Sequence, residues 1–335
     1  MALILPEGYK SRLDGRTTEK AIKFIRDTFQ HEIVTALNLQ RISAPLFVRP
    51  ETGLNDNLNG VERPVSFDAP CLGGETLEIV HSLAKWKRMT LGKYDFPIGE
   101  GLYTDMNAIR RDEEVDNLHS MYVDQWDWEV VIDSKARELR TLKNYVMRVY
   151  NAMKATMARV CSKFPQLENN FPEEIEFITT QKLADMYPNL SSKEREDKLL
   201  REKKAVFLMK IGGELTTGEP HDGRAPDYDD WELNGDILMY YPLLDCCFEL
   251  SSMGIRVDEN SIKSQCEKAN CLDRLNLPFH KKILEKELPY TIGGGIGQSR
   301  LCMFMLNKAH IGEVQASVWP DDMVEKCTKS GIRLL

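Results

Sequence analysis

The strand-like segment from His119 to Ile132 carries polar side chains at alternate positions. Successive side chains of a strand point to opposite faces, so Gln125, Asp127 and Glu129 share one face. Three aromatic side chains occupy the other face, which is predicted to pack into the core. The polar face has two possible interpretations. It is either the solvated side of a one-sided antiparallel sheet, or a floor that binds the amino or carboxylate group of a small ligand.

A second strand-like segment, near residue 250, shows the same mixture of apolar and polar positions. Alternation puts Glu249 and Ser251 on one face, and Arg256 joins them only if Gly254 introduces a bulge, which glycine permits. Asp236, on the preceding segment, is predicted to face Glu249. Mg²⁺ is held by one or two carboxylates together with substrate phosphates, so this pair is a candidate magnesium site. Two carboxylates among fifty-two acidic residues do not by themselves establish one.

A glycine run at Gly293-Gly294-Gly295-Ile296-Gly297 leads through Gln298 and Ser299 to Arg300. It is neither a Walker A loop nor a dinucleotide fingerprint, because the lysine and the third glycine of those motifs are missing. A permissive backbone entering a helix that carries an arginine suits a nucleotide. The alternative is a tight turn between a strand and a helix.

Basic clusters are few in this acidic chain. Lys85-Trp86-Lys87-Arg88 follows Ser82, where a strand is predicted to give way to a helix, and Arg110-Arg111 follows a segment rich in glycine and aromatic residues. A net charge of −8 argues against a protein built to hold nucleic-acid backbone. The two clusters are therefore either solvated faces or the places that neutralise an anionic small substrate.

Helices and strands are both needed to position these residues. Apolar spacing predicts helices over residues 18–39 and 134–164, and Ser191 with Glu194 forms a capping box that opens another. Strand-like stretches cover residues 77–81, 119–132, 205–211, 236–244 and 246–257. Because they are long and close in sequence, we expect an α+β fold in which helices pack on a predominantly antiparallel sheet. We expect one domain over residues 1–335.

Composition limits the class of protein. The chain has 335 residues, 42% of them hydrophobic and 29% charged, as in soluble globular proteins. No apolar run approaches the roughly 20 residues that cross a bilayer, and no secretory signal is visible. The eight cysteines form no CxxC pair and the six histidines have no i, i+4 spacing, so we expect reduced thiols, a cytoplasmic protein and no zinc site.

In order along the chain, these segments resemble one family, the ammonia-dependent (type A) asparagine synthetases, or aspartate–ammonia ligases. The blocks that carry the resemblance are Asp56-Asn57-Leu58-Asn59-Gly60, residues 80–88, 99–104 and 122–129, Arg224-Ala225-Pro226-Asp227-Tyr228-Asp229-Asp230-Trp231, residues 248–256 and the glycine run to Arg300. The resemblance spans almost the whole chain. That family is in turn similar to the catalytic domains of class II aminoacyl-tRNA synthetases.

The resemblance implies a homodimer that uses L-aspartate, ATP, Mg²⁺ and ammonia, and that makes asparagine through a β-aspartyl adenylate, releasing AMP and pyrophosphate. It assigns Arg110 to the α-phosphate, Arg300 to adenine near the γ-phosphate, Asp236 and Glu249 to the metal, and Asp229 and Gly295 to the nucleotide site. Aspartate is expected among Asp56, Ser82, Lys87, Gln125, Asp127, Ser251 and Arg256. Asp56 is also the candidate that deprotonates ammonium.

Two rival functions share part of this pattern. An aspartyl- or asparaginyl-tRNA synthetase would need an anticodon-binding domain, for which we expect no room before the first helix. A non-catalytic paralogue that senses aspartate or AMP would be expected to lose metal carboxylates or phosphate arginines, and Asp236, Glu249, Arg110 and Arg300 are all present. We therefore expect an enzyme that binds neither nucleic acid nor membrane.

Overall fold

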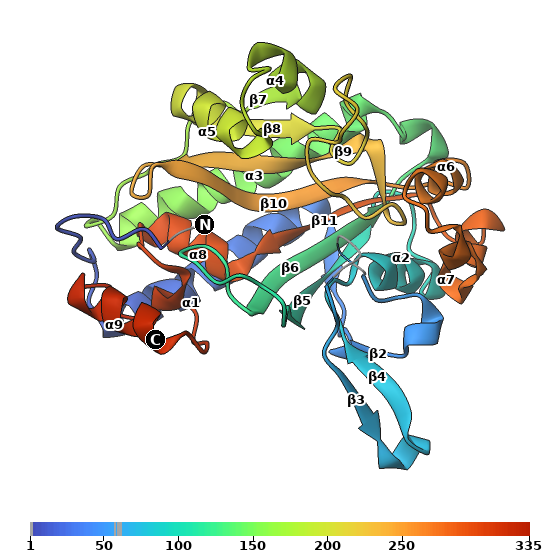
Figure 1. Ribbon diagram of the computed structural model, residues 1–335, viewed down its shortest axis with the longest axis horizontal. Coiled ribbons are helices and arrows are strands. Elements are labelled where there is room, and N and C mark those ends of the chain that lie inside the picture. The colour runs from blue at the N-terminus through green and yellow to red at the C-terminus, as the bar shows by residue number, and fades with distance from the viewer. Residues whose placement is uncertain (1–2, 57, 59–61) are drawn as a thin grey trace.

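The main sheet organises the molecule (Figure 1). The computed structural model describes residues 3–56, 58 and 62–335, and within them eight strands follow the order β1-β5-β6-β11-β10-β9-β8-β7. Only the outer pairs, β1 with β5 and β7 with β8, are parallel in this described sheet. The strands are Leu39–Arg41 (β1), Gly101–Ile109 (β5), Tyr122–Val131 (β6), Glu176–Thr179 (β7), Ala205–Met209 (β8), Asp229–Tyr241 (β9), Cys246–Arg256 (β10) and Thr291–Gly297 (β11). The predicted antiparallel α+β architecture is confirmed.

Helices α1 (Gly15–Leu37), α3 (Leu139–Lys163) and α8 (Gln298–Leu306) cover one side of the sheet. The predicted apolar stripe of α1 is buried at Ile22, Ile25, Phe29, Ile33 and Leu37. It packs with the buried stripe of α3 and with the aromatic face of β6, where Trp126 and Trp128 lie in the same core. The amphipathic pattern of both helices therefore fixed which face of the sheet became the core.

Shorter helices surround the sheet. They are Ala84–Lys93 (α2), Thr180–Met186 (α4), Ser192–Lys203 (α5), Ser261–Lys268 (α6), Pro278–Leu284 (α7) and Asp321–Lys329 (α9). The predicted capping box is present at the start of α5, where Ser191 and Glu194 exchange hydrogen bonds with each other's backbone N–H groups. None of the helices in the described residues has the length and apolar character that crossing a membrane requires.

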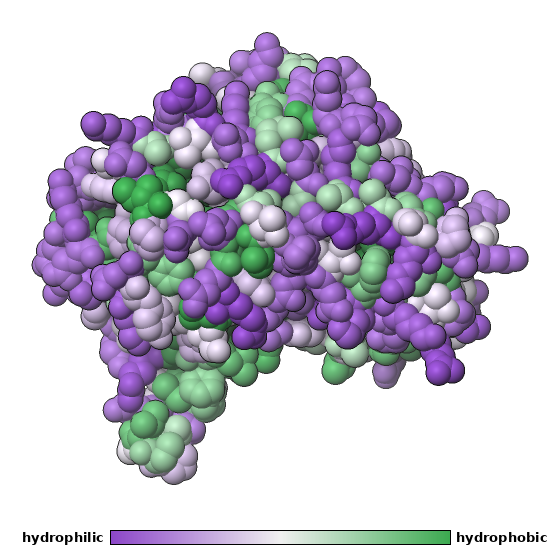
Figure 2. Space-filling view, turned by 180° about the vertical axis from the view of Figure 1, so that it is seen from behind, coloured by the Kyte–Doolittle hydropathy of each residue, from purple (hydrophilic) through white to green (hydrophobic). Residues whose placement is uncertain are grey.

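A small sheet projects from the body as an arm, with the order β2-β4-β3 (Figure 1). Its strands are Phe47–Val48 (β2), Ser66–Ala69 (β3) and Glu75–Ile79 (β4). The rings of Phe47 and Phe67 meet at 5.3 Å and remain 46% and 39% exposed. Figure 2 shows the resulting apolar surface on the arm.

The glycine run forms strand β11 in the middle of the sheet, between β6 and β10, and not a flexible loop. Gly297 then caps α8 directly, so the predicted change from strand to helix is present. The expectation that residues 1–335 form a single domain stays a prediction.

Candidate active site

A cavity of about 430 Å³ opens on the side of the sheet opposite to α1 and α3. Strands β6, β9, β10 and β11, the start of α2, and the segment between β8 and β9 all contribute to its wall. All but one of the predicted site residues line it: Asp56, Ser82, Lys87, Arg110, Gln125, Asp127, Asp229, Asp236, Glu249, Arg256, Gly295 and Arg300. The exception is Ser251. The sequence therefore identified the wall of one cavity from segments far apart in the chain.

Ser251 was expected on the face of Glu249, and the structure contradicts this. Glu249 pairs with Leu238 but Ser251 pairs with Ile237, so Leu250 is an extra residue that shifts the register. The shift turns Ser251 away from the cavity, where its hydroxyl donates to the carbonyl of Gly295 over 3.0 Å. Ser252 takes its place in the cavity wall. Arg256 lies on the cavity side, and the register shifts a second time between Gly254 and Arg256, where the bulge was predicted.

Lys87, Gln125 and Asp127 form the polar floor predicted from β6. The Lys87 Nζ lies 3.4 Å from Asp127 Oδ1 and donates to the Gly294 carbonyl over 3.1 Å. Burial lowers the pKa of Lys87, although the charge of Asp127 opposes that change. This end of the cavity therefore presents a cation and a carboxylate side by side, the pair of charges that recognises an amino acid.

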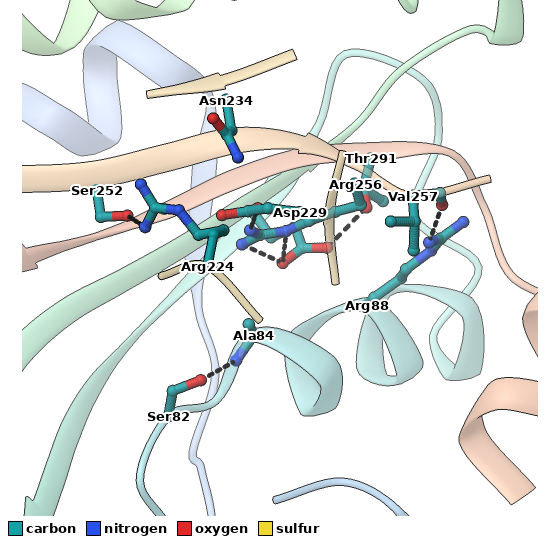
Figure 3. A network of polar contacts seen from close by, with 12 residues as sticks. Ser82, Ala84, Arg88, Arg224, Asp229, Asn234, Ser252, Arg256, Val257 and Thr291 are labelled. Carbon is teal, nitrogen blue, oxygen red and sulfur yellow. Dashed lines mark hydrogen bonds and ion pairs between the residues drawn. The ribbon is translucent and has the colours of Figure 1, made fainter. Parts of the chain in front are cut away.

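Arg256 lies between two buried carboxylates. Its Nε and Nη2 donate to Glu129 Oε2 over 3.2 and 3.1 Å, and its Nη1 contacts Asp229 (Figure 3). Burial lowers the pKa of Arg256, but Glu129 and Asp229 raise it above its ordinary value. The guanidinium is therefore fixed and permanently charged at the cavity wall, as binding of a carboxylate requires.

The glycines of β11 allow this packing. A Cβ on Gly295 would lie 2.8 Å from Asp127 Oδ1 and would also strike Gln125, and a Cβ on Gly293 would lie 2.6 Å from Arg256 Nη2. Any side chain at either position would displace the polar floor. The run thus makes room for the polar side chains of neighbouring strands, and its predicted contact with a nucleotide stays a prediction.

Asp236 and Glu249 share the far corner of the cavity with three arginines. Burial and the charge of Glu249 raise the pKa of Asp236 to about 7, against the effect of Arg224. Burial raises the pKa of Glu249, but Arg300, Arg224 and Arg110 lower it by more, so that its pKa lies below the ordinary value. Arg300 Nη1 lies 3.4 Å from Glu249 Oε2.

This donor set fits Mg²⁺. Oxygen ligands are what the ion prefers, and burial and the charge of Glu249 raise the pKa of Asp236 even though Arg224 pairs with it, so a further cation is favoured at this pair. Among the described residues, no group of three or more histidine, cysteine, aspartate or glutamate side chains is arranged to hold a metal ion. Asp236 and Glu249 therefore suit an ion that takes its other ligands from phosphate and water.

Asp56 lies on a loop that several buried groups hold in place. Its carbonyl oxygen lies 3.1 Å from the His81 ring, and Lys85 Nζ donates to the carbonyl of Asn55 over 2.9 Å. Asp56 Oδ2 is buried and has no hydrogen-bond partner among the described residues. Asn57, Asn59 and Gly60 of this predicted motif lie outside the described residues.

Sequence reasoning missed the site roles of Arg224, Tyr228 and Ser252, which also line the cavity. Arg224 Nη2 donates to Asp236 Oδ1 over 2.6 Å, and Nη1 donates to Ser252 (Figure 3). Burial and the charges of Asp56 and Asp229 raise the pKa of Tyr228. The available signal was the block Arg224–Trp231, in which only Asp229 received a role.

A family profile described as aspartate–ammonia ligase matches residues 16–331. The chain belongs to the aspartate–ammonia ligase family. It is similar to the aspartate–ammonia ligase of Ruminiclostridium cellulolyticum, with 63% identity over 100% of this chain and 99% of the relative. The enzyme of that name from Lactobacillus johnsonii is 59% identical over the full length of both chains. The family predicted from the sequence is thus confirmed.

Solved structures show the same fold at low identity. Asparaginyl-tRNA synthetase from Pyrococcus horikoshii, complexed with asparaginyl-adenylate, has a TM-score of 0.64 at 13% identity over 91% of this chain and 70% of that one. The Entamoeba histolytica asparaginyl-tRNA synthetase has a TM-score of 0.63 at 12% identity, over 90% of this chain and 66% of its own. The predicted likeness of this ligase family member to class II synthetase catalytic domains is confirmed.

Proposed function

We propose that this aspartate–ammonia ligase family member joins aspartate and ammonia at the expense of ATP, through a β-aspartyl adenylate, and releases AMP and pyrophosphate. The observation that carries the proposal is the placement of two sites in one cavity. An amino-acid floor of Lys87, Gln125 and Asp127 lies in the same cavity as the corner of carboxylates and arginines. Activation of a carboxylate by ATP needs both.

The amino-acid end is suited to hold aspartate in one orientation. Asp127 suits the α-amino group, with Gln125 and Ser82 nearby, because a carboxylate pairs with an ammonium ion. Arg256 and Lys87 are the cations available for the substrate's carboxylates. Holding the substrate at both ends leaves the reacting carboxylate fixed relative to the nucleotide, which is the main entropic advantage of a bound reaction.

Activation converts the carboxylate into an ester that ammonia can attack. An oxygen of the aspartate side chain attacks the α-phosphorus, and the bond from that phosphorus to pyrophosphate breaks. We assign Arg110 to the α-phosphate and Arg300 to adenine near the γ-phosphate, and we assign Asp229 and Gly295 to the wall of the nucleotide site. Asp236 and Glu249 would hold Mg²⁺, which neutralises phosphate charge when bound. Fixed cations act most strongly where charge develops in the transition state.

Ammonia must reach the adenylate as neutral NH₃. Asp56 supports this step, because its Oδ2 is buried at the cavity wall without a partner and can accept a proton from NH₄⁺. The nitrogen then attacks the acyl carbon, and the bond to AMP breaks. The proton lost by the attacking nitrogen passes to water, because Asp56 already holds the proton taken from NH₄⁺.

We also propose that two copies associate and that tRNA is not a substrate. The exposed rings of Phe47 and Phe67 on the arm supply an apolar surface that a second copy can cover. The net charge of −8 disfavours binding to a nucleic-acid backbone. The sensor alternative receives no support from the cavity, because the carboxylates and arginines assigned to chemistry all line it.

The deciding experiment measures AMP and asparagine with ATP, aspartate and Mg²⁺, with and without ammonium. AMP and asparagine should appear together only when ammonium is added. ADP and phosphate as the only nucleotide products would contradict an adenylate. Ammonia-free glutamine in place of ammonium should give a much lower rate, and an equal rate would contradict free ammonia as the nitrogen donor.

A further inference from the structure

Arg224 donates a hydrogen bond to Asp236 Oδ1, an oxygen that a metal ion would also bind. Its Nη1 donates to Ser252 (Figure 3). Its Nη2 lies 2.6 Å from Asp236 Oδ1, and the register of Ser252 follows from the bulge at Leu250. The side chain is only 11% exposed, and its Nε is buried without a partner. Arg224 lines the cavity, so among the described residues its guanidinium has one donor, Nε, without a partner there.

Arg224 also lies in the corner assigned to the phosphates. Arg224, Arg300 and Arg110 all line the cavity, and Arg300 Nη1 lies 3.4 Å from Glu249 Oε2. ATP with its metal brings negative charge into this corner. A third arginine there pairs with that charge as readily as with Asp236, because planar guanidinium groups match phosphate oxygens in bidentate contacts.

Arg224 cannot stay paired with Asp236 when a metal ion binds to that carboxylate. Mg²⁺ needs closely held oxygen ligands, and a guanidinium on Asp236 Oδ1 both blocks that oxygen and repels the dication. Displacement of Arg224 from Asp236 would leave a buried charge without a partner, which is costly unless an anion replaces the carboxylate. The phosphates of the substrate are that anion.

The backbone around Arg224 is held, so a change of partner falls to the side chain. The buried ring of His221, three residues earlier, lies 2.8 Å from Glu196 on α5. Ala225 and Asp227, which follow, are both buried, and Asp227 is paired with Lys85 over 2.7 Å. The long arginine side chain can move between partners while the segment stays in place.

We infer that Arg224 is a further phosphate-binding residue, which neutralises Asp236 in the empty enzyme and transfers to the pyrophosphate portion of the substrate when the metal ion binds. This inference rests on the proposed function, because it takes Asp236 as a metal ligand. On this account Arg224 holds the leaving pyrophosphate. It also keeps the carboxylate corner neutral between turnovers.

The test measures two ligands whose affinities should change in opposite directions. The variants are Arg224→Ala and Arg224→Gln, and the control is Arg201→Ala, which removes an arginine paired with Asp245 outside the cavity. Mn²⁺ is the metal probe, and free Mn²⁺ is counted by electron paramagnetic resonance. Inorganic pyrophosphate with Mg²⁺ is the anion probe, measured by calorimetry.

Both Arg224 variants should bind Mn²⁺ alone more tightly than the wild type, because the competing cation is gone. They should bind magnesium pyrophosphate about 10- to 100-fold more weakly, the loss expected for a charged hydrogen bond. The control should match the wild type in both. If Arg224 had only a structural role, both variants would bind both ligands more weakly, and that result would overturn the inference. Unchanged binding of pyrophosphate by a variant that folds would overturn it too.

Melting curves identify which variants fold, and Arg224→Gln keeps a donor for Ser252 if Arg224→Ala does not fold. Failure of the proposed function would be seen separately. In that case the wild type would form no AMP from ATP, aspartate and ammonium, whatever the difference between the variants and the wild type in the binding measurements.

Discussion

Lys87 and Asp127 meet at the floor of the cavity, with Nζ of the lysine 3.4 Å from Oδ1 of the aspartate and both side chains almost fully buried. Neither charge can be removed without leaving the other alone in a poorly solvated place. Asp127 also accepts a hydrogen bond from the backbone N–H of Leu83, just before α2. The pair therefore links the floor of the sheet to the helix that supplies the lysine.

Asp127→Ala should raise the KM for aspartate strongly and leave the affinity for ATP little changed. The reason is that the carboxylate lies at the amino-acid end, on the face of β6 that also carries Gln125. Steady-state kinetics with each substrate varied in turn provide the measurement. If the change weakened ATP and spared aspartate, the assignment of this strand to the amino-acid pocket would be wrong.

Arg110→Ala should slow formation of the adenylate by several orders of magnitude while aspartate still binds. Arg110 lines the cavity, its Nη1 makes only a long ion pair with Glu113 at 3.8 Å, and its Nε has no partner among the described residues, so the guanidinium can turn to a phosphate. Loss of one donor to developing charge costs on the order of 10²–10³ in rate in other enzymes. Pyrophosphate exchange measures the step, and calorimetry with aspartate serves as the control. If pyrophosphate exchange were normal in this variant, the assignment of Arg110 to the α-phosphate would be wrong.

The sequence predicted the fold and most of the site because both follow local rules. Alternation along β6 placed Gln125 and Asp127 on one face, and helical spacing located the buried stripe of α1. Ser251 was assigned wrongly because one extra residue, Leu250, reverses every later position of a strand. No local pattern announced that residue.

Arg224 was not assigned a role for a different reason. It lies in an irregular segment between β8 and β9, where no periodicity relates a residue to a face. Its partners, Asp236 and Ser252, are set by strand register and by the bulge, and both are properties of the folded sheet. The sequence shows that Arg224 belongs to a family motif, but it gives no physical basis for a role of this side chain.

His310 should make the stability of the protein fall as the pH falls below 6.5. Burial lowers its pKa from 6.5 to about 4, so the folded state resists the proton that the unfolded chain accepts in this window. Linkage gives a loss of about 2 kcal/mol by pH 5. His310→Gln should therefore show a flatter dependence of the unfolding free energy between pH 7 and pH 5. If urea titrations gave the same pH dependence of the unfolding free energy for both proteins, His310 would not be its cause.

Phe67→Glu should weaken association of the chain with itself. The wild type is expected to be a dimer at micromolar concentration, and a charge beside Phe47 on the arm would cost much of the apolar contact. Light scattering with dilution gives the dissociation constant, and Leu272→Glu, at an exposed apolar position outside the arm, is the control. A wild-type monomer would contradict the dimer, and an unchanged dimer in Phe67→Glu would move the interface off the arm.

Glu129→Gln should destabilise the protein without removing any group that lines the cavity. Glu129 is fully buried, accepts two hydrogen bonds from Arg256 and one from Thr291, and is absent from the cavity wall. Breaking a buried ion pair by neutralising one partner costs roughly 3–5 kcal/mol, and the lower end applies because Asp229 still pairs with Arg256. Glu75→Gln, which neutralises the exposed partner of Arg49, should change the stability little, because exposed ion pairs contribute little. The measurement is the unfolding free energy in urea, with the KM for aspartate followed beside it. A small loss of stability together with a large rise in the KM for aspartate would mean that Glu129 mainly orients Arg256 toward the substrate. Equal effects of Glu129→Gln and Glu75→Gln on stability would mean that the buried ion pair contributes little to it.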